Sequence, residues 1–314
     1  MPVWNEERHL RSAVKQVLEQ DYPGELELVV ALAPSTDRTE EIAKEIVSED
    51  PRVRLLVNPA GITPAGLNAA IAEAKHGIIV RVDGHGILSP GYIRRAVELL
   101  EETGAANVGG VMAARGETPF EQAVARAYTR PLGLGGGRFH VGGEAGPVDS
   151  VYLGVFRRSV LEELSGYDET FVRAQDWELN YRIRKAGGTI WFSPELEVTY
   201  RPRPTLRKLA RQFFDTGRWR RAVARLHPGT VTYRYLAPPL ALLGCVVGLT
   251  AGLIGLVTGV PWLLWGFAAP GGYLCGVLVG SVIVSGGLPW RARLWLPPAV
   301  VVMHLSWGAG FLLS

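Results

Sequence analysis

Asp83 and His85 form a pair whose chemistry suits the binding of phosphate through a metal ion. They follow the apolar segment 78–82 and are separated only by Gly84. Because an aspartate and a histidine two positions apart at the end of a strand can point into one crevice, they could hold a hard or borderline divalent ion that bridges phosphate oxygens. A tight turn with an aspartate cap explains the same residues structurally, so the pair alone leaves both interpretations open.

Three other polar groups lie where helices are expected to begin. They are residues 2–7 (Pro-Val-Trp-Asn-Glu-Glu), residues 35–39 (Ser-Thr-Asp-Arg-Thr) and residues 173–179, which contain Asp176. Acidic side chains stabilise the N-terminus of a helix, and serine, threonine and aspartate are common cap residues. Local structure can therefore explain each group taken singly.

The elements that must position these residues alternate between strand and helix. Short apolar runs predict strands at residues 26–32, 53–57, 78–82 and 107–112. Apolar residues with helical spacing predict helices at residues 10–18, 42–47, 67–74 and 93–100. This pattern predicts a Rossmann-like α/β domain, with a mostly parallel sheet covered by helices on both faces. Ligands of such sheets bind outside the carboxyl ends of the strands, where residues 35–39 and 83–85 lie.

The composition divides the chain into two unlike parts. The 314 residues carry 33 Lys and Arg against 30 Asp and Glu, a formal charge of +3, and the mean hydropathy is +0.13. The last acidic residue is Asp215, and no charged residue lies between Arg234 and Arg291. A polar first part is thus followed by a hydrophobic tail, which excludes a wholly soluble enzyme, a disordered or collagen-like chain and a disulfide scaffold.

The tail contains three stretches of the length that a membrane-spanning helix needs, about 20 residues. They are residues 236–257, 262–284 and 294–313. Basic residues before the first stretch, together with Arg291 and Arg293, predict that the polar part faces the cytoplasm and that three spans leave the C-terminus outside. The alternative is a hairpin buried in a soluble core, but no partner domain is long enough to bury it. We interpret His304 as a helix-packing residue, so the tail is predicted to be an anchor rather than a transport path.

Taken together and in order, the polar groups resemble glycosyltransferase family 2, whose members are inverting enzymes with the GT-A fold. Within it they resemble the membrane-anchored succinoglycan-biosynthesis-type subgroup. Residues 2–7 are similar to the family's opening P-x-x-N-E, and residues 35–39 match S-T-D-x-T. Residues 82–85 match the subgroup's version of D-x-D, in which histidine replaces the last aspartate.

Two further motifs of the family follow in the same order. Residues 165–169 and 175–182 match G-x-D-E and E-D-x-E-L-x-x-R, with Gln175 where the family often has glutamate. Residues 212–219 resemble a relaxed Q-x-x-R-W. The resemblance covers about residues 1–225 and the C-terminal spans. The ordered set is specific, although no single motif is decisive.

The resemblance implies a role for each matching residue. Asp176 would be the catalytic base, because an inverting transferase needs one carboxylate on the acceptor side. Asp83 and His85 would bind a divalent metal, Mg²⁺ or Mn²⁺, that acts as a Lewis acid on the leaving group. Asp83 would contact either this metal or the donor ribose. The other donor-binding residues would be Pro2, Asn5, Glu6, Asp37, Gln212, Arg218 and Trp219.

Residues 205–225 predict a basic amphipathic helix at the membrane surface, beside anionic lipid. Within it, Arg218 could place a planar cation on the donor diphosphate with Trp219 packed beside it, or could contact a lipid headgroup. No nucleic-acid recognition module accompanies these arginines, so no nucleic-acid partner is expected. The expected domains are a cytoplasmic GT-A domain (1–204), this interface helix with a linker (205–234), and a membrane domain of about three helices (235–314).

The resemblance implies a membrane-anchored inverting glycosyltransferase at the cell membrane, with its catalytic domain in the cytoplasm. It would move a sugar from a nucleotide-diphosphate donor to a polyprenyl-linked or growing polysaccharide acceptor. Two departures from the family pattern leave alternatives open. Residues 32–34 are Leu-Ala-Pro where the family usually has acidic residues, one of which reads the base of a UDP-sugar, and the first strand is nearly absent. The alternatives are a non-catalytic subunit of a polysaccharide assembly or export complex, and a polyprenyl-phosphate sugar transferase.

Overall fold

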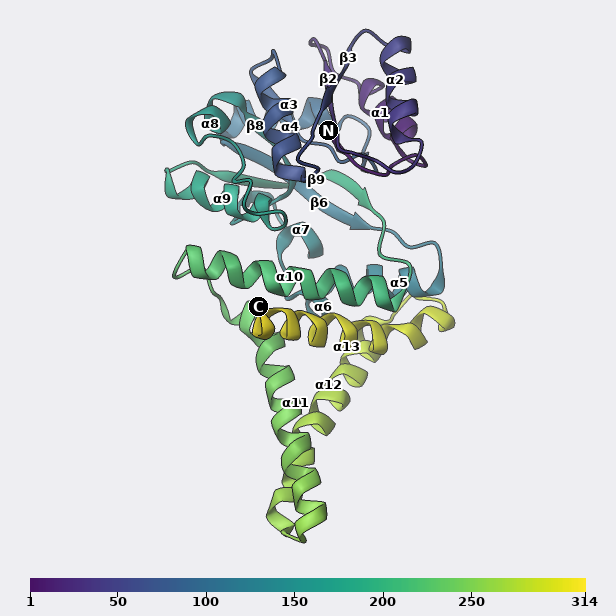
Figure 1. Cartoon of the computed structure of the whole chain (residues 1–314), viewed down its shortest axis with the longest axis vertical. Coiled ribbons are helices and arrows are strands. Elements are labelled where there is room, and N and C mark those ends of the chain that lie inside the picture. Colours follow the sequence, from purple (N-terminus) through teal and green to yellow (C-terminus); the bar gives the residue numbers. More distant parts are fainter. The chain divides into compact units, whose positions relative to one another are not determined.

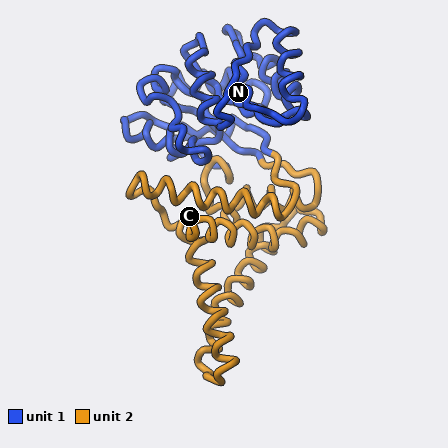
Figure 2. The backbone as a smooth tube through the Cα atoms, in the orientation of Figure 1, with its two compact units in different colours: residues 1–113, 142–200 blue, residues 114–141, 201–314 orange.

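The computed structural model describes residues 1–314 and divides them into two compact units (Figure 2). Unit 1 comprises residues 1–113 and 142–200, and unit 2 comprises residues 114–141 and 201–314. The division near residue 200 lies close to the boundary expected at residue 204. Residues 114–141, in contrast, pack with the C-terminal part of the chain, which nothing in their hydropathy indicates.

The first sheet of unit 1 contains three parallel strands in the order β1-β2-β3. They are β1 (Pro2–Val3), β2 (Leu28–Leu32) and β3 (Val53–Val57). Every residue of β2 is buried, as expected for an apolar strand covered on both faces.

The second sheet of unit 1 has the order β4-β8-β6-β9-β5, with β7 paired to β9. Its strands are β4 (Ile78–Val80), β5 (Ile87–Leu88), β6 (Asn107–Ala114), β7 (Gly146–Pro147), β8 (Tyr152–Arg157) and β9 (Ile190–Tyr200). The α/β fold class is confirmed, and residues 78–82 and 107–112 contribute strands as expected. Both of these strands, however, pair antiparallel with β8, which comes much later in the chain than the alternating pattern.

The helices of unit 1 are α1 (Leu10–Leu18), α2 (Thr39–Glu49), α3 (Thr63–Glu73), α4 (Tyr92–Thr103), α8 (Arg158–Glu163) and α9 (Gln175–Lys185). The first four correspond to the helices that apolar spacing predicts. For example, α1 buries Leu10, Ala13, Val14 and Val17. These side chains share one hydrophobic core with residues of β2, α4 and β8.

The first strand is only two residues long, in agreement with the sequence analysis. Pro2 and Val3 pair with Ala31 and Leu32, at the carboxyl end of β2. Beside the other end of β2 lies a cavity of about 130 Å³, lined mainly by apolar side chains of β2, α3 and β4. The short β1 therefore still pairs with the carboxyl end of β2, which is the end that the polar motifs follow.

Unit 2 is helical. It contains α5 (Pro119–Tyr128), α6 (Pro131–Leu134), α7 (Arg138–Val141), α10 (Leu206–Leu226), α11 (Tyr233–Thr258), the 3₁₀ helix η1 (Pro261–Phe267), α12 (Ala268–Val284) and α13 (Trp290–Leu313). Three helical segments are long and apolar enough to cross a membrane: Tyr233–Thr258, Pro261–Val284 and Trp290–Leu313. They correspond to the three stretches predicted from the sequence.

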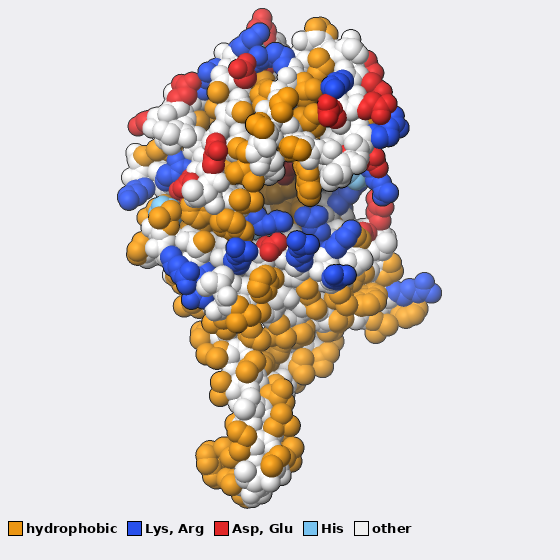
Figure 3. Space-filling view, in the orientation of Figure 1, with side chains coloured by type: hydrophobic (Ala, Val, Ile, Leu, Met, Phe, Trp, Pro, Cys, Tyr) orange, Lys and Arg blue, Asp and Glu red, His pale blue; other side chains and the backbone are white.

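α11 and α12 form a long hairpin (Figure 1). Gly248, Gly252 and Gly255 are among the few buried residues of α11, and their lack of side chains lets η1 and the start of α12 approach closely. Small residues at helix contacts are typical of association within a bilayer, where close packing rather than the hydrophobic effect holds helices together. The outer surface of the hairpin is apolar (Figure 3).

α13 does not follow this hairpin but lies beside α10 (Figure 1). Gly217 of α10 packs against the main chain of Trp307, and Gly310 of α13 packs against the main chain of Phe214. The backbones therefore touch at two places along the pair. His304 contacts Leu132 O through Nε2 at 2.9 Å and the Tyr273 hydroxyl through Nδ1 at 3.3 Å, which confirms that it is a helix-packing residue.

Candidate active site

The P-x-x-N-E and S-T-D-x-T motifs form one hydrogen-bonded structure in unit 1. The main-chain N–H of Thr36 donates to Asn5 Oδ1 (2.8 Å), and the N–H of Asn5 donates to Ser35 Oγ (3.1 Å). The N–H of Glu6 donates to Thr39 Oγ1 (2.7 Å). Asn5 has a φ of 53°, in the left-handed region that asparagine tolerates better than most residues. These contacts fix the loop after β1 against the loop after β2.

Asp37 stabilises the second of these loops. Its carboxylate accepts hydrogen bonds from the N–H groups of Thr39 (3.1 Å) and Glu7 (3.3 Å). Desolvation alone would raise the pKa of Asp37, but the hydrogen bonds from Thr39 and Glu7 outweigh it and hold the pKa below its ordinary value. Asn5 and Asp37 thus hold the loops together, and their predicted part in donor binding stays a prediction, as does that of Pro2.

Glu6 also reaches the D-x-D-like motif. Its Oε1 lies 2.7 Å from His85 Nδ1, and the Glu6 side chain is only 17% exposed. Gly84 lets the two approach, because a Cβ at that position would lie 3.2 Å from Glu6 Cγ. When Nδ1–H donates to a carboxylate, the tautomer is fixed and the lone pair of the imidazole is on Nε2. Many metal-binding histidines are oriented in this way.

The most informative residue is one that the motifs did not include, Arg81. Its side chain is only 5% exposed, and its Nη2 lies 3.4 Å from Asp83 Oδ1. Its Nη1 forms an ion pair with Asp176 Oδ1. The structure therefore brings Asp83 and Asp176, which are far apart in the sequence, to the same guanidinium.

The surroundings of Arg81 compensate for its burial. Burial alone would lower the pKa of Arg81, but the charge of Asp83 contributes to a net rise in that pKa. The guanidinium also lies over the ring of Tyr167, 5.8 Å from its centroid. A buried arginine within an apolar run requires anionic partners, so its position in the run Ile-Ile-Val-Arg-Val was the signal available in the sequence.

Asp176 is not a helix cap. The N-cap of α9 is Ala174, whose φ of 61° is unfavourable for alanine, and no side chain caps the helix. Asp176 lies in the first turn with its carboxylate on Arg81. Its carboxylate therefore takes part in an ion pair within unit 1 and does not cap the helix.

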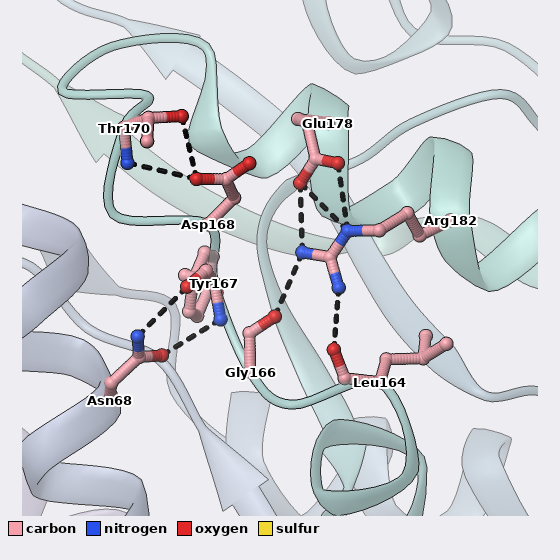
Figure 4. Close-up of polar contacts among 8 residues, drawn as sticks. All are labelled: Asn68, Leu164, Gly166, Tyr167, Asp168, Thr170, Glu178 and Arg182. Atoms are coloured by element: carbon pink, nitrogen blue, oxygen red, sulfur yellow. Dashed lines mark hydrogen bonds and ion pairs between the residues drawn. The ribbon is translucent and has the colours of Figure 1, made fainter. Parts of the chain in front are cut away.

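Two side chains hold the start of α9 in place (Figure 4). Arg182 donates from Nε to Glu178 Oε1 (2.8 Å), from Nη1 to Leu164 O (2.8 Å) and from Nη2 to Gly166 O (2.8 Å). Glu178 is 1% exposed, and both of its carboxylate oxygens accept hydrogen bonds from Arg182. The E-x-x-x-R part of the motif thus joins the helix of Asp176 to the preceding loop.

Asn68 of α3 holds the same loop from the other side (Figure 4). Its Oδ1 accepts from Tyr167 N and its Nδ2 donates to Tyr167 O, both at 2.8 Å. Asp168 accepts from the N–H of Thr170 at 2.9 Å, which closes the turn that follows. The G-x-D-E motif is therefore a structural loop, and Asn68 is a positioning residue that no sequence pattern identified.

The Q-x-x-R-W residues lie on α10, in unit 2. Gln212 Oε1 accepts from Arg203 Nε at 3.3 Å, and the guanidinium of Arg218 lies 6.0 Å from the centroid of the Trp219 ring. The cation–aromatic pairing of Arg218 and Trp219 agrees with their predicted packing. Their contact with a donor, and that of Gln212, remains a prediction.

The residues around Asp83 fit a metal only in part. No group of three or more His, Cys, Asp and Glu side chains converges anywhere in the chain. Asp83 and His85 supply one carboxylate and one imidazole, so further ligands would have to come from a diphosphate and water. Mg²⁺ in phosphate sites is commonly bound in this way, by one or two protein carboxylates together with substrate phosphates.

The α/β fold, with the carboxylate of Asp83 after β4 and that of Asp176 in the first turn of α9, is the arrangement expected of a glycosyltransferase. A family model described as "Glycosyl transferase family 2" matches residues 1–165, and the chain belongs to this family. It is 33% identical over 313 residues to the succinoglycan biosynthesis protein ExoA of Rhizobium meliloti (strain 1021), covering 99% of this chain and 92% of ExoA. The predicted family is thereby confirmed, and the alternative of a non-catalytic subunit is not supported.

A more distant relative is an enzyme of Methanococcus voltae. It is named dolichyl N-acetyl-alpha-D-glucosaminyl phosphate 3-beta-D-2,3-diacetamido-2,3-dideoxy-beta-D-glucuronosyltransferase. It is 24% identical over 226 residues, which are 69% of this chain and 70% of the relative.

Solved structures show the same fold. The mannosyltransferase PcManGT from Pyrobaculum calidifontis, solved with GDP-Man and Mn²⁺, matches with a TM-score of 0.59 and 18% identity, over 97% of this chain and 84% of that one. TarS 1–349 of S. aureus, solved with UDP, matches with a TM-score of 0.50 and 16% identity, over 75% of this chain and 68% of that one. At these identities the likeness establishes the GT-A fold and no more.

Proposed function

We propose that this glycosyltransferase transfers a sugar with inversion from a nucleotide-diphosphate donor to a lipid-linked or growing polysaccharide acceptor, with Asp176 as the base. The observation that supports this most directly is the contact of Asp83 and Asp176 with the same guanidinium of Arg81. A donor bound at Asp83 would then have its sugar within reach of Asp176. The similarity to ExoA over nearly the whole chain supports a polysaccharide acceptor.

The reaction needs a base on the acceptor side and a stabilised leaving group. Asp176 takes the proton of the acceptor hydroxyl while the oxygen of that hydroxyl forms the new bond to the anomeric carbon. The bond from that carbon to the diphosphate breaks, and the diphosphate leaves with the electron pair. In the structure, Arg81 holds the carboxylate of Asp176 in an ion pair. We therefore expect donor or acceptor binding to loosen this ion pair before proton transfer.

Asp83 and His85 would hold a divalent metal, Mg²⁺ or Mn²⁺, with the diphosphate completing the ligand set. Bound there, the metal would supply a Lewis acid for the charge that develops on the leaving group. Glu6 supports the proposal, because its carboxylate on Nδ1 orients the ring of His85. The presence of Mn²⁺ beside GDP-Man in PcManGT is a further argument for a metal in this fold.

We propose that the donor is a UDP-sugar, as the family resemblance implies. Leu32 and Ala33 are buried and carry no group that could read the base, and Pro34 is exposed. Selection of the nucleotide would then depend on main-chain groups or on other residues. Competition between UDP and GDP for donor binding would separate the two nucleotides that bind the structural relatives.

We further propose that the apolar hairpin anchors the enzyme in the cell membrane, with unit 1 in the cytoplasm. The exposed surface of α11 and α12 supports membrane anchoring, and the basic residues of α10 and the start of α13 support this orientation. A cytoplasmic site would have access to nucleotide sugars and to an acceptor carried on a polyprenyl lipid.

The decisive test is Asp176→Asn, assayed in native membranes with each nucleotide sugar and with Mg²⁺ or Mn²⁺. We expect turnover to fall by at least about 100-fold, the usual contribution of a general base. Asp149→Asn is the matched control, since Asp149 is exposed and its ion pair to Arg184 lies on the surface. Full turnover by Asp176→Asn would disprove the mechanism. Product analysis then separates elongation of a saccharide from formation of a single polyprenyl-linked sugar.

A further inference from the structure

α13 is apolar enough to cross a membrane, yet it lies along a highly charged helix. Besides the glycine contacts described above, Arg221 of α10 donates from Nη1 to the carbonyl oxygens of Phe311 (2.8 Å) and Leu312 (2.7 Å). α10 and α13 therefore run side by side within unit 2, as Figure 1 shows. They must share one orientation relative to any membrane.

The charges on α10 exclude an upright orientation of this pair. Exposed basic residues occur along the whole helix: Arg207, Lys208, Arg211, Arg218 and Arg225. The 21 residues of α10 extend about 31 Å, the thickness of the hydrocarbon core. If α13 crossed the bilayer, the central arginines of α10 would lie inside it, each at a cost of roughly 2.5–3.5 kcal/mol.

Both ends of α13 are also attached to polar helices. Near its start, the Trp295 ring packs edge-on against Phe120 of α5, with centroids 5.5 Å apart. Near its end, Arg225 Nη2 donates to Ser314 O at 3.3 Å. α5 is a helix of the water-soluble type, with a capping box made by Thr118 and Glu121. A spanning helix would instead have its two ends on opposite sides of the bilayer.

The α11–α12 hairpin has the opposite character. The segment 235–284 contains no charged residue, and leucines and valines cover its surface. α11 extends about 39 Å, which is enough to cross. At its tip, Trp262 and Trp265 are 70% and 79% exposed, as aromatic side chains at a membrane–water interface would be. At its base, Arg126 of α5 donates to Val284 O (2.6 Å) and Gly286 O (2.7 Å) at the end of α12.

We propose that only α11 and α12 cross the bilayer, and that α13 lies flat in the interface beside α10. The partner of this surface is the lipid bilayer: Trp290, Leu294 and Trp295 would enter the acyl boundary while Arg291 and Arg293 contact headgroups. The chain then crosses twice, and Ser314 is on the same side as unit 1. This departs from the three spans expected from hydropathy, and it does not depend on the sugar-transfer reaction.

Single-cysteine labelling of the full-length protein tests the topology. In a Cys245→Ala, Cys275→Ala background, Glu25→Cys reports on unit 1, Thr258→Cys on the hairpin tip and Ser314→Cys on the C-terminus. A membrane-impermeant maleimide is added separately to sealed right-side-out and inside-out vesicles. We expect positions 25 and 314 to be labelled in one preparation and position 258 in the other. Labelling of positions 314 and 258 from the same side would overturn the proposal, as would labelling of position 258 together with position 25.

Depth measurement tests the flat orientation independently. Spin labels at Leu294→Cys, Val302→Cys and Leu313→Cys should report the same shallow depth in the bilayer, whereas a label at Val247→Cys in α11 should be several times less accessible to a water-soluble relaxation agent. A label at position 302 as deep as that at 247 would contradict the proposal. The proposal would also be contradicted if no lipid-soluble relaxation agent reached the labels on α13, because protein would then cover the face of α13 that we assign to lipid.

Discussion

Glu6 Oε1 and His85 Nδ1 lie 2.7 Å apart, so the first motif of the chain orients the histidine of the third. A glutamate that sequence analysis assigned to donor binding thus contacts a proposed metal ligand. Its main-chain N–H is already held by Thr39. The position of the His85 ring therefore depends on two loops as well as on its own turn.

Glu6→Gln should weaken metal binding. The amide keeps the shape but removes the charge that makes His85 a better ligand, so we expect the affinity for Mn²⁺ in the presence of a nucleoside diphosphate to fall about 10–100-fold. Electron paramagnetic resonance of free Mn²⁺ in detergent-solubilised protein measures this directly. Glu7→Gln is the matched control, since the side chain of Glu7 accepts a hydrogen bond from Arg38 N, whereas that of Glu6 contacts His85. Identical titration curves for Glu6→Gln and the native protein would contradict the proposed role.

Arg81→Gln should destabilise unit 1 strongly. It would leave Asp83 and Asp176 partly buried without their shared cation, and breaking a buried pair costs about 3–5 kcal/mol. Thermal unfolding should show a large decrease in Tm, whereas Arg52→Gln, which removes an exposed pair with Asp50, should cost no more than about 1 kcal/mol. The double variant Arg81→Gln, Asp176→Asn should recover part of the loss. Additive losses would show that the two side chains are not coupled.

Arg182→Lys should reduce turnover without large effects on donor binding. Lysine keeps the charge but cannot make the planar fork that joins Glu178, Leu164 and Gly166, so the start of α9 should become mobile. We expect kcat to fall about 10-fold or more with the donor KM nearly unchanged, because a small displacement of the base is costly. Faster proteolysis within residues 164–174 would accompany it. Arg184→Lys on the same helix should change neither quantity.

The hydrogen bonds of Asp37 should appear in the pH dependence of stability. Its pKa in the folded state lies below the unfolded value of about 3.9. The ionised carboxylate therefore stabilises the folded protein above about pH 4, and this contribution is lost as the pH falls through the lower, folded pKa. The Tm difference between the native protein and Asp37→Asn should be constant from pH 5 to 8 and should narrow below pH 4. A difference that stays constant down to pH 3 would exclude this role.

The elements of unit 1 that short-range patterns specify could be predicted from the sequence. α1 and α4 bury the faces that their spacing indicated, and β2 is the fully buried strand that its composition required. The antiparallel pairing of β4 and β6 with β8 could not be predicted, because it depends on contacts between residues far apart in the chain. The packing of residues 114–141 with the C-terminal helices was unexpected for the same reason.

The candidate site shows the same limit. Asp83, His85 and Asp176 could be selected from motifs, because their types and order are specific. Asn68 could not, since an asparagine on a helix has no local signature of the bonds it makes to a loop about 100 residues away. Hydropathy likewise identified α13 as apolar but carries no information on the charged helix beside it.

The bonds that Glu6 makes to both Thr39 and His85 couple the loops at this end of unit 1. Thr39, Glu6 and His85 form a chain of contacts in which each member restrains the next. A change at Thr39 should be felt at the imidazole, although the two side chains do not touch. Mutational effects here should therefore be strongly non-additive, so that losing one link removes much of what the others contribute.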